Sequence, residues 1–360
     1  MGVFSSGRMD TQTFKQQFDV FAENWVQKKL AEYPDLVLDE QVLSYITHSG
    51  KLIRGGGKRV RPYLCALMYE ACGGLQSEQT WQAGLAIELF HTFALIHDDI
   101  IDRGAMRRSV PTTHVVVHDI LDRAHRLGDI AHVADGQAML VGDLVQLWAF
   151  EVFQQLPCAE SVKQKAFHTF ITMINEVIVG EMLDVDFTTR DTVSNSLLYQ
   201  KTVLKTATYT FVRPLQIGAI LAGGGKDVLE FCERFGRALG MAFQIQDDLF
   251  DLTLSEDMLH KPVLSDIQER QHTLFTQYIL TKGTEQEKEV FLSYFGKSLG
   301  EEEKVRVREL FVSSGAIAYG MEEMNRYFDQ AVACLECMSF GGGYLEVFKQ
   351  SVQFIRQRTS

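Results

Sequence analysis

Apolar residues recur every three or four positions along most of the chain, which is the spacing of one face of an α-helix. In residues 10–48, Phe14, Phe18 and Trp25 follow this spacing, and the pattern breaks near Pro34. Strands would instead show apolar and polar residues in alternation, and that alternation is absent throughout the sequence. The sequence therefore predicts an all-α protein.

The same periodicity predicts further helices, which glycine, proline or polar segments separate. They cover residues 63–72, 78–102, 136–155, 159–188, 197–223 and 231–254, with more helical packing beyond about residue 275. Residues 118–135 are rich in His, Asp and Arg and lack a clear apolar period, so we expect a surface loop or a short helix there. Because no Pro/Ser-rich linker divides the chain, one domain over residues 1–360 is expected.

Two of the predicted helices end in the same cluster of carboxylates. The two triads are Asp98, Asp99 and Asp102, and Asp247, Asp248 and Asp251. Within each triad the side chains span about one third of the helix circumference, and an apolar stem precedes them. Three like charges beside apolar surface are costly unless a cation neutralises them. Oxygen ligands without a nearby cysteine favour Mg²⁺ over Zn²⁺.

A solvated acidic helix face is the alternative reading of a single triad. The second triad argues against it, because chance surface patterning would rarely duplicate both the acids and their apolar stem. If the two helices face each other, their carboxylates would form a cage around several Mg²⁺ ions.

Basic residues accompany the triads along the sequence. Lys58 and Arg61 follow a run of three glycines at the start of a predicted helix, and Arg107 and Arg108 follow the first triad. Helix starts and paired guanidinium groups are good binding sites for phosphate. Acids and arginines in such close succession therefore indicate a metal–diphosphate site rather than a surface patch of ion pairs.

Charged residues also interrupt two helices between the triads. Glu181 and Asp184 share one face of a predicted helix at i, i+3 spacing. Lys201 and Lys205 lie in an otherwise apolar helix. A lysine in such a place either extends its ammonium group to the surface or binds an anion.

The composition limits the choice of partners and compartment. With 35 Lys and Arg against 47 Asp and Glu, the net charge is −12. Nucleic acid is therefore not expected as a partner, since phosphate backbones require a basic surface. The sequence has no run of roughly 18 apolar residues and no signal-peptide pattern, so no transmembrane segment is expected. The six scattered cysteines are typical of reduced thiols in a cytoplasmic protein.

Taken in order, the motifs resemble those of the trans-isoprenyl diphosphate synthase family, over roughly residues 40–275. Gly57-Lys58 with Arg61-Pro62 resembles the motif G-K-x-x-R-P. The segment from His91 to Asp102 resembles the helix that ends in the first aspartate-rich motif, D-D-x-x-D, and Arg107-Arg108 resembles the arginine pair after it. Lys205-Thr206 resembles the K-T motif, and Phe243-Gln244 before Asp247 resembles the second aspartate-rich motif. Residues 276–360 are expected to form C-terminal helices beyond these motifs.

The resemblance implies the isoprenoid synthase fold, a helical bundle around a deep central cavity, and a homodimer. It implies three Mg²⁺ ions held by Asp98, Asp102 and Asp247, with Asp99, Asp248 and Asp251 in support. Isopentenyl diphosphate would be bound by Lys58, Arg61, His91 and Arg108, and the allylic diphosphate by Arg107, Lys205, Gln244 and Lys261. Lys205, Thr206 and Gln244 would be the residues closest to the chemistry, with Thr206 and Gln244 beside the developing carbocation.

The implied activity is a Mg²⁺-dependent prenyl transfer. Isopentenyl diphosphate is joined head to tail (1'-4) to an allylic diphosphate, and diphosphate is released. Cations neutralise the departing diphosphate, and an apolar, water-free pocket shelters the carbocation. Two alternatives are a terpene cyclase, which does not need a site for isopentenyl diphosphate, and a non-catalytic partner subunit of a prenyl synthase, which should have lost one of the triads.

The length of the product would depend on the helix that precedes Asp98. Phe93 lies five residues before Asp98, Ala94 lies four before it, and Phe90 is one turn further back. An aromatic floor at this depth resembles that of short-chain enzymes, so we expect the C20 product geranylgeranyl diphosphate, with the C15 product farnesyl diphosphate as the next choice. The alternative is that these phenylalanines face the protein core.

Three features depart from the family pattern. Glu181 stands where the family usually has Gln, and Gln271 stands where it usually has a second lysine. Gln271 directly follows the segment 255–270, which is expected to close over the site as a lid. Arg270 is a candidate replacement for that lysine. The stretch 118–135 is also longer than is usual, and we assign no role to it.

Overall fold

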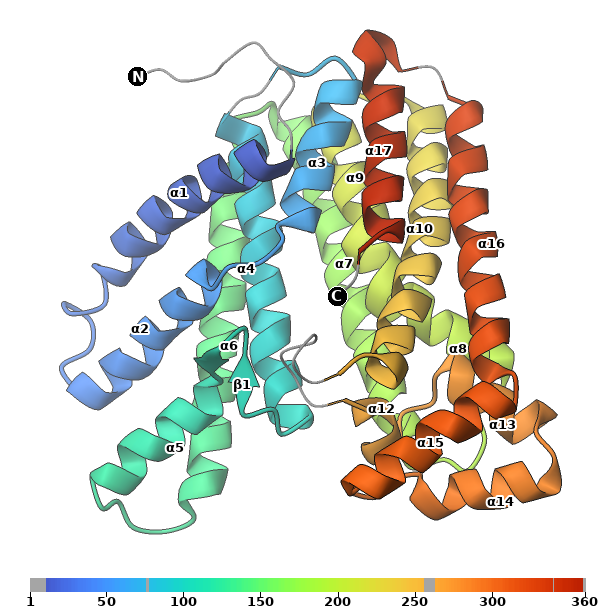
Figure 1. The fold of residues 1–360 in the computed structure, drawn as a ribbon. Helices are drawn as coiled ribbons and strands as arrows, with labels where there is room; N and C mark the ends of the chain where they lie inside the picture. The colour runs from blue at the N-terminus through green and yellow to red at the C-terminus, as the bar shows by residue number, and fades with distance from the viewer. Residues whose placement is uncertain (1–10, 76–77, 256–262, 339, 359–360) are drawn as a thin grey trace. The chain divides into compact units, whose positions relative to one another are not determined.

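The computed structural model describes residues 11–75, 78–255, 263–338 and 340–358 (Figure 1). These residues form two compact units, one comprising Met1–Glu70 and Gly74–Phe167 (unit 1) and the other Ala71–Gly73 and His168–Ser360 (unit 2). Both units are built from helices, which confirms the predicted all-α class. The expectation of one domain over the whole chain stays a prediction.

The elements of unit 1 are α1 (Thr11–Leu30), α2 (Glu40–Arg54), α3 (Val60–Ala71), α4 (Glu78–Ile101), β1 (Met106–Arg107), β2 (Val110–Pro111), α5 (Thr113–Arg123) and α6 (Ile130–Gln154). Helix α7 (Glu160–Phe187) begins in unit 1 and ends in unit 2. Unit 2 continues with α8 (Asn195–Thr202), the π-helix η1 (Val203–Val212), α9 (Arg213–Leu221), α10 (Lys226–Thr253) and α12 (Ser265–Gln268). Its C-terminal part consists of α13 (Leu274–Lys282), α14 (Glu285–Tyr294), α15 (Glu301–Ser313), α16 (Ala316–Glu336), the 3₁₀ helix η2 (Gly341–Gly343) and α17 (Tyr344–Arg356).

Helix α4 is the core of unit 1. It packs along α6, and α1 and α2 lie against it (Figure 1). Its residues from Ala83 to Phe93 are all buried, as expected of a helix that is apolar on every side. At the start of α4, Trp81 stacks on Phe14 and Phe18 of α1, with ring centroids 5.2 and 5.9 Å apart. The first triad therefore stands at the end of a rigidly packed helix.

Helix α10 has the corresponding place in unit 2. It packs against η1, α9, α16 and α17, and α16 and α17 run beside it in Figure 1. Gly240 lets η1 approach closely, because a Cβ atom there would lie 2.4 Å from the Cα atom of Ala207. The rings of Phe231 and Phe235 meet Phe348 of α17 edge to face. The second triad thus also ends a helix with a buried, apolar stem.

One hairpin was not predicted, so the expectation of no strands was wrong at this point. Strands β1 and β2 pair antiparallel, with Arg107 opposite Val110. Each strand has two residues, which is too short for an alternating pattern to be recognised. The turn residues Arg108 and Ser109 have φ angles of 53° and 63°, without the Gly or Asn that usually signals such a turn.

The stretch 118–135 is more helical than expected. Helix α5 covers its first part, and α6 begins at Ile130 rather than at residue 136. In α5 the buried residues are Thr113, Val117 and Leu121, on one face at i, i+4 spacing. Only two of these three residues are apolar, and the rest of the stretch is mostly polar. Such a short apolar pattern is too weak to predict a helix from the sequence.

The predicted helix over residues 197–223 is a succession of α8, η1 and α9. The sequence does not reveal the change to π-helical hydrogen bonding in its middle, because the spacing of apolar residues indicates which face is buried and not which backbone groups are paired. The other predicted helices are confirmed with small shifts at their ends, as in α4, α7 and α10.

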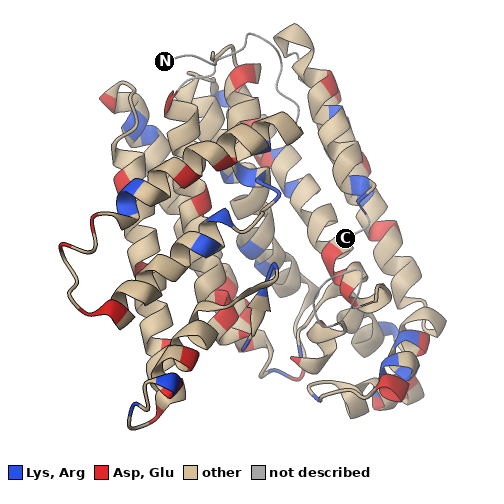
Figure 2. Ribbon diagram, turned by 60° about the vertical axis from the view of Figure 1, so that its left-hand side comes forward, with Lys and Arg blue, Asp and Glu red and all other residues tan. Residues whose placement is uncertain are grey.

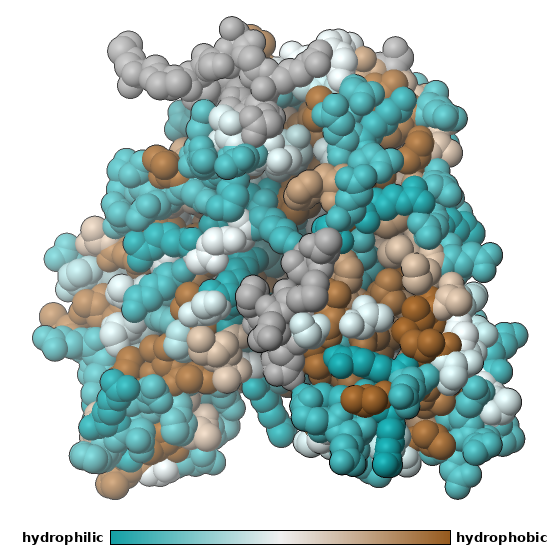
Figure 3. Space-filling model, in the orientation of Figure 1, coloured by the Kyte–Doolittle hydropathy of each residue, from teal (hydrophilic) through white to brown (hydrophobic). Residues whose placement is uncertain are grey.

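Basic and acidic residues are interspersed along the helices of both units (Figure 2). The face seen in Figure 3 is largely hydrophilic, with apolar residues scattered among polar ones. Among the described helices, none combines the length and the hydropathy that are needed to span a bilayer.

Candidate active site

A neighbouring arginine binds two carboxylates of the first triad. The Nε atom of Arg107 donates to Oδ1 of Asp99 at 2.7 Å, and its Nη2 atom donates to Oδ2 of Asp98 at 3.0 Å. Asp99 is buried, and this burial raises its pKa to about 6 against the opposing effect of Arg107. Its other oxygen, Oδ2, is buried without a hydrogen-bond partner in the described part of the chain.

The small hairpin places Arg107 beside the triad. Arg107 lies in β1, and the Oγ1 atom of Thr112, just after β2, donates to the carbonyl oxygen of Gly104 at 2.7 Å. The backbone N–H of Gly104 donates to the carbonyl oxygen of Asp99 at 2.8 Å. These bonds fix the backbone of the hairpin beside the end of α4, and the guanidinium group of Arg107 is held by its own contacts with Asp98 and Asp99.

A second group of cations in unit 1 surrounds His91. Burial, with Arg61 and Arg108 nearby, holds the pKa of His91 well below its usual range, so its ring is neutral. Arg108 lies at the turn of the hairpin, where desolvation lowers its pKa against the attraction of Glu88. A Cβ atom at Gly57 would lie 2.7 Å from Nη1 of Arg108. The backbone at Gly57 therefore lies close to the guanidinium group of Arg108. The side chain of Lys58 is exposed.

Arg59, in the same turn, has a structural role. It is buried, its Nε atom donates to Asp19 at 2.7 Å and its Nη1 atom donates to Glu88 at 2.6 Å. Its Nη2 atom donates to the carbonyl oxygen of Ile53 at 2.6 Å. These contacts explain why Glu88 interrupts the apolar stem of α4.

The predicted floor residues lie along α4. Phe90 is 0% exposed and Phe93 is 7% exposed, and their ring centroids are 5.5 Å apart. The ring of Phe93 also packs on His97, at 4.5 Å between centroids. Ala94 is half-buried. Both phenylalanine rings are buried in unit 1, and the roles of Phe93, Ala94 and Phe90 in product length stay predictions.

A residue from the far end of the chain binds one carboxylate of the second triad. The Nη2 atom of Arg358 donates to Oδ1 of Asp247 at 2.5 Å and to the carbonyl oxygen of Phe243 at 3.1 Å. Its Nε atom donates to Gln246 at 2.5 Å. The guanidinium carbon lies 3.9 Å from the ring centroid of Phe243. The sequence shows Arg358 only as part of a basic tail, and nothing in its spacing indicates this contact.

Asp248 ends a short chain of hydrogen bonds. The Oγ1 atom of Thr206 donates to Oε1 of Gln244 at 2.6 Å, and Nε2 of Gln244 donates to Oδ1 of Asp248 at 2.7 Å. Desolvation raises the pKa of Asp248 to about 7, although Gln244 and Lys201 act in the opposite direction. Three predicted site residues are thus connected within unit 2.

Asp251 holds the start of α12. Its Oδ1 atom accepts from the N–H and the hydroxyl of Ser265, at 3.2 and 2.8 Å, and its Oδ2 atom accepts from the N–H of Asp266 at 3.1 Å. Both carboxylate oxygens of Asp251 therefore accept hydrogen bonds from the start of α12, which agrees with a role in supporting the metal ligands rather than in binding metal itself. Lys261, the predicted lid lysine, lies outside the described residues.

Arg270 does not act as a lid cation in this structure. Its Nη2 atom donates to Oδ1 of Asp191 at 2.9 Å, and its guanidinium carbon lies 5.6 Å from the ring centroid of Phe295. These partners indicate a structural role rather than a replacement for the lysine absent at Gln271.

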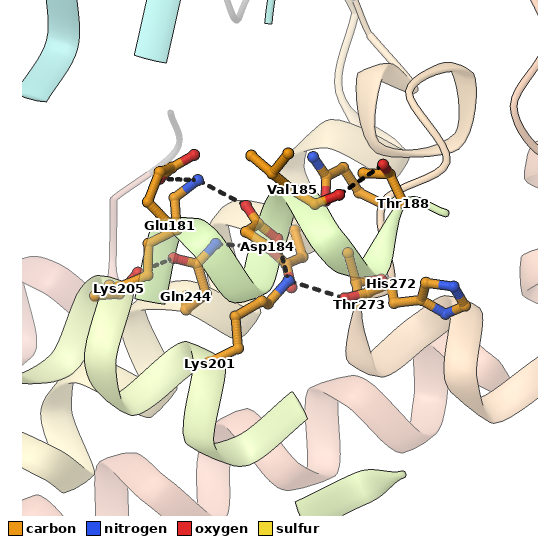
Figure 4. Close-up of polar contacts among 12 residues, drawn as sticks. Glu181, Asp184, Val185, Thr188, Lys201, Lys205, Gln244, His272 and Thr273 are labelled. Carbon is orange, nitrogen blue, oxygen red and sulfur yellow. Dashed lines mark hydrogen bonds and ion pairs between the residues drawn. The ribbon is translucent and has the colours of Figure 1, made fainter. Parts of the chain in front are cut away.

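Lys205 belongs to a cluster of alternating charges (Figure 4). Its Nζ atom lies 2.7 Å from Oε2 of Glu181 and 2.6 Å from Oδ2 of Asp184. Lys201 lies 2.7 Å from the other oxygen of Asp184. Glu181, Asp184 and Lys201 were not predicted as site residues, although their shared helix faces were noted in the sequence.

The donors of both triads fit Mg²⁺. All are carboxylate oxygens, and one of them, Oδ2 of Asp99, is buried without a partner in the described chain. Within the described residues, however, no three His, Cys, Asp or Glu side chains are grouped closely enough to hold a metal by themselves. Neither triad alone is therefore a preformed metal site, and the expected cage of carboxylates from both helices stays a prediction. Mg²⁺ suits this arrangement, because it is usually bound by one or two carboxylates together with water and substrate phosphates.

Comparisons with known proteins all point to one family. The chain matches the model of the polyprenyl synthetase family over residues 41–311. It is 32% identical over 292 residues to the geranylgeranyl diphosphate synthase of Sulfolobus acidocaldarius, covering 80% of this chain and 82% of that protein. It is also 32% identical over 316 residues to the short chain isoprenyl diphosphate synthase of Methanothermobacter thermautotrophicus, covering 86% and 87%.

A solved structure is similar over almost the whole chain. It is the geranylgeranyl pyrophosphate synthase of Corynebacterium glutamicum, complexed with isoprenyl diphosphate and magnesium. The TM-score is 0.88 at 25% sequence identity, and the alignment covers 95% of this chain and 99% of that chain.

Proposed function

This chain belongs to the polyprenyl synthetase family and is a prenyltransferase, and from that premise we propose that it joins isopentenyl diphosphate head to tail (1'-4) to allylic diphosphates. The main product is geranylgeranyl diphosphate (C20), and diphosphate is released. The observation that carries the proposal is the pair of apolar helices, α4 and α10, that each end in an aspartate triad with an arginine on its carboxylates.

The triads hold Mg²⁺ through Asp98, Asp102 and Asp247, with three ions in the complete complex. Bound Mg²⁺ neutralises the diphosphate as it leaves. Asp99, Asp248 and Asp251 support the ligands: Asp99 by binding Arg107, Asp248 by binding Gln244, and Asp251 by anchoring α12.

The allylic diphosphate is bound by Arg107, Lys205, Gln244 and Lys261 in this proposal. Positive charge on the oxygens of the leaving group stabilises the transition state of C–O cleavage. Near the reacting carbon, Thr206 already points its hydroxyl at Gln244. The oxygens of these two side chains can therefore orient their dipoles toward the carbocation without introducing a full negative charge.

Isopentenyl diphosphate is bound by Lys58, Arg61, His91 and Arg108. The low pKa of His91 supports this assignment, because a neutral ring donates one hydrogen bond without adding to the crowding of cations. Closely spaced cations repel one another, so the binding of an anionic diphosphate between them is favourable. A terpene cyclase would have no use for this site, and a non-catalytic subunit would have no use for two complete triads.

We further propose a homodimer. On α6, Val133, Leu140 and Leu147 are exposed and recur at seven-residue spacing, and on α7 so do Ile178 and Val185 with Met182 between them. Apolar stripes of this kind on exposed helix faces are typical of protein interfaces. The six free thiols support the expected cytoplasmic location.

The test of the proposed function is an elongation assay. Purified protein is incubated with Mg²⁺, isopentenyl diphosphate and C5, C10 or C15 allylic diphosphates, and the products are separated by chain length. The proposal expects products that accumulate at C20, and it expects removal of metal by EDTA to stop the reaction. Absence of elongation from every primer would refute it.

A further inference from the structure

The cluster around Lys205 contains a second lysine to which the proposed function gives no task. Lys201, one turn before Lys205, is half-buried, with 12% of its side chain exposed. Its Nζ atom donates to Oδ1 of Asp184 at 2.7 Å and to the carbonyl oxygen of His272 at 3.0 Å (Figure 4). A lysine with two such partners is fixed in position rather than extended into solvent.

Asp184 lies between the two lysines. One carboxylate oxygen binds Lys201 and the other binds Lys205. Burial alone would raise the pKa of Asp184, but the two lysines hold it well below its usual range. Asp184 is therefore ionised, and its single negative charge is shared by two positive charges.

Lys205 in turn lies between two carboxylates. It contacts Glu181 as well as Asp184. The contact depends on close packing of α7 on η1, because a Cβ atom at Gly180 would lie 2.5 Å from the backbone nitrogen of Lys205. The cluster is a row of alternating charges, Glu181, Lys205, Asp184 and Lys201, with no net charge.

We propose that Lys201 is a positioning residue that frees Lys205 for the diphosphate of the allylic substrate. Without Lys201, Lys205 would neutralise two carboxylates alone, and a diphosphate would have to compete with both for it. With Lys201 present, Asp184 keeps a cation when Lys205 turns to the substrate. Glu181 itself contacts Lys205, so Lys201 balances the charge of Glu181 only through the row, by binding Asp184. The inference rests on the proposed function, in which Lys205 binds a diphosphate.

The test measures binding of inorganic diphosphate with Mg²⁺ by calorimetry, together with KM and kcat for farnesyl diphosphate. Lys201→Met should weaken diphosphate binding and raise KM by about tenfold, the size of one lost charge-assisted interaction. It should change kcat by less than about threefold, since the interaction is made in the ground state too. Lys201→Arg should keep the affinity for diphosphate and the KM near their wild-type values. Lys226→Met, at the exposed start of α10, serves as the matched control.

The decisive variant is Glu181→Gln combined with Lys201→Met. In this double variant Lys205 contacts one carboxylate only, that of Asp184. The affinity for diphosphate should therefore return to within about twofold of the wild-type value. A purely structural role of Lys201 predicts no such rescue. Should Lys201→Met fail to fold in thermal unfolding, Lys201→Gln takes its place in both backgrounds.

The inference is overturned if Lys201→Met binds diphosphate as the wild type does, or if the double variant is no better than Lys201→Met. Failure of the proposed function has a different signature: the wild type would elongate no primer, whereas the binding series would still report on Lys201.

Discussion

The two aspartate triads have the same spacing but are bound by arginines that come from different parts of the chain. In unit 1, Asp98 and Asp99 are bound by Arg107, which comes from the hairpin that directly follows α4. In unit 2, Asp247 is bound by Arg358, which follows α17 near the C-terminus of the chain. Asp99 is 3% exposed at its side chain, whereas Asp247 is 41% exposed.

The same motif is thus bound by an arginine from adjacent backbone in one unit and by an arginine from a distant part of the chain in the other. Arg107 is held by backbone pairing and by the bonds of Gly104 and Thr112 to the end of α4. Arg358 is held by its own side-chain contacts with Phe243, Gln246 and Asp247. We therefore expect Arg107 to stay beside its triad throughout the reaction and Arg358 to compete with metal for Asp247.

The largest effect should follow removal of the acids themselves. Asp98→Ala and Asp247→Ala should each lower turnover by at least about a hundredfold, because each removes a ligand that neutralises the leaving diphosphate. Both variants should remain folded, which circular dichroism would report. Asp227→Ala, at an exposed position of α10, is the matched control and should behave as the wild type. If Asp98→Ala or Asp247→Ala were as active as the wild type, the triad that contains the replaced residue would not be part of the active site.

Replacing the two arginines sharpens the contrast. Arg107→Gln should raise KM for the allylic diphosphate by about tenfold or more, since a fixed charge-assisted contact is lost. Arg358→Gln should change turnover by less than about threefold and should tighten binding of Mn²⁺ in place of Mg²⁺, because a cation that competes for Asp247 is gone. If Arg358→Gln weakened Mn²⁺ binding, Arg358 would be part of the metal site rather than its competitor.

The apolar stems of the two triads also differ. Five residues before the first acid, α4 has Phe93, whereas α10 has Ala242 at the same distance from Asp247. Phe93→Ala should therefore lengthen the product beyond C20, as mass spectrometry of the products would show. Phe153→Ala, at a fully buried position of α6, is the matched control: it should cost about 3–5 kcal/mol of stability by leaving a core cavity, without changing product length. A product profile unchanged in Phe93→Ala would place the floor elsewhere.

The smallest effect concerns Asp248 in the metal-free protein. Its folded pKa of about 7 exceeds the value of about 3.9 for an unfolded chain, so the folded state binds the proton more tightly. This contribution to stability is complete below pH 4 and is lost as the pH rises toward 7. Asp248→Asn should therefore raise the Tm by a few degrees more at pH 8 than at pH 5. Equal changes at both pH values would show that Asp248 is ionised with an ordinary pKa.

The sequence predicted the two organising helices and the family. The apolar stems of α4 and α10 are long enough for their period to be unmistakable, and the order of five motifs led to a resemblance that the comparisons confirm. The all-α isoprenoid synthase fold is confirmed by the likeness to the Corynebacterium glutamicum enzyme. The expectation that the two triads face each other stays a prediction.

The features that were missed depend on contacts between distant segments or on very short elements. Arg358 reaches Asp247 across more than a hundred residues, and no local pattern records that pairing. The hairpin at Arg107 has too few residues for a period. Lys201 and Asp184 were each seen on a helix face, but their contact follows from the packing of α7, where Gly180 allows close approach. Physical reasoning from periodicity thus places helices and their faces, but not the partners that meet across them.

The number of bound metal ions shows directly whether both triads serve one metal-dependent transfer. Mn²⁺ is titrated into the wild type, Asp98→Ala and Asp247→Ala in the presence of inorganic diphosphate, and free Mn²⁺ is followed by electron paramagnetic resonance. We predict about three ions per chain for the wild type, as the proposed complex requires, and the loss of at least one ion in each variant. Binding of the same number of ions with the same affinity by all three proteins would contradict the account.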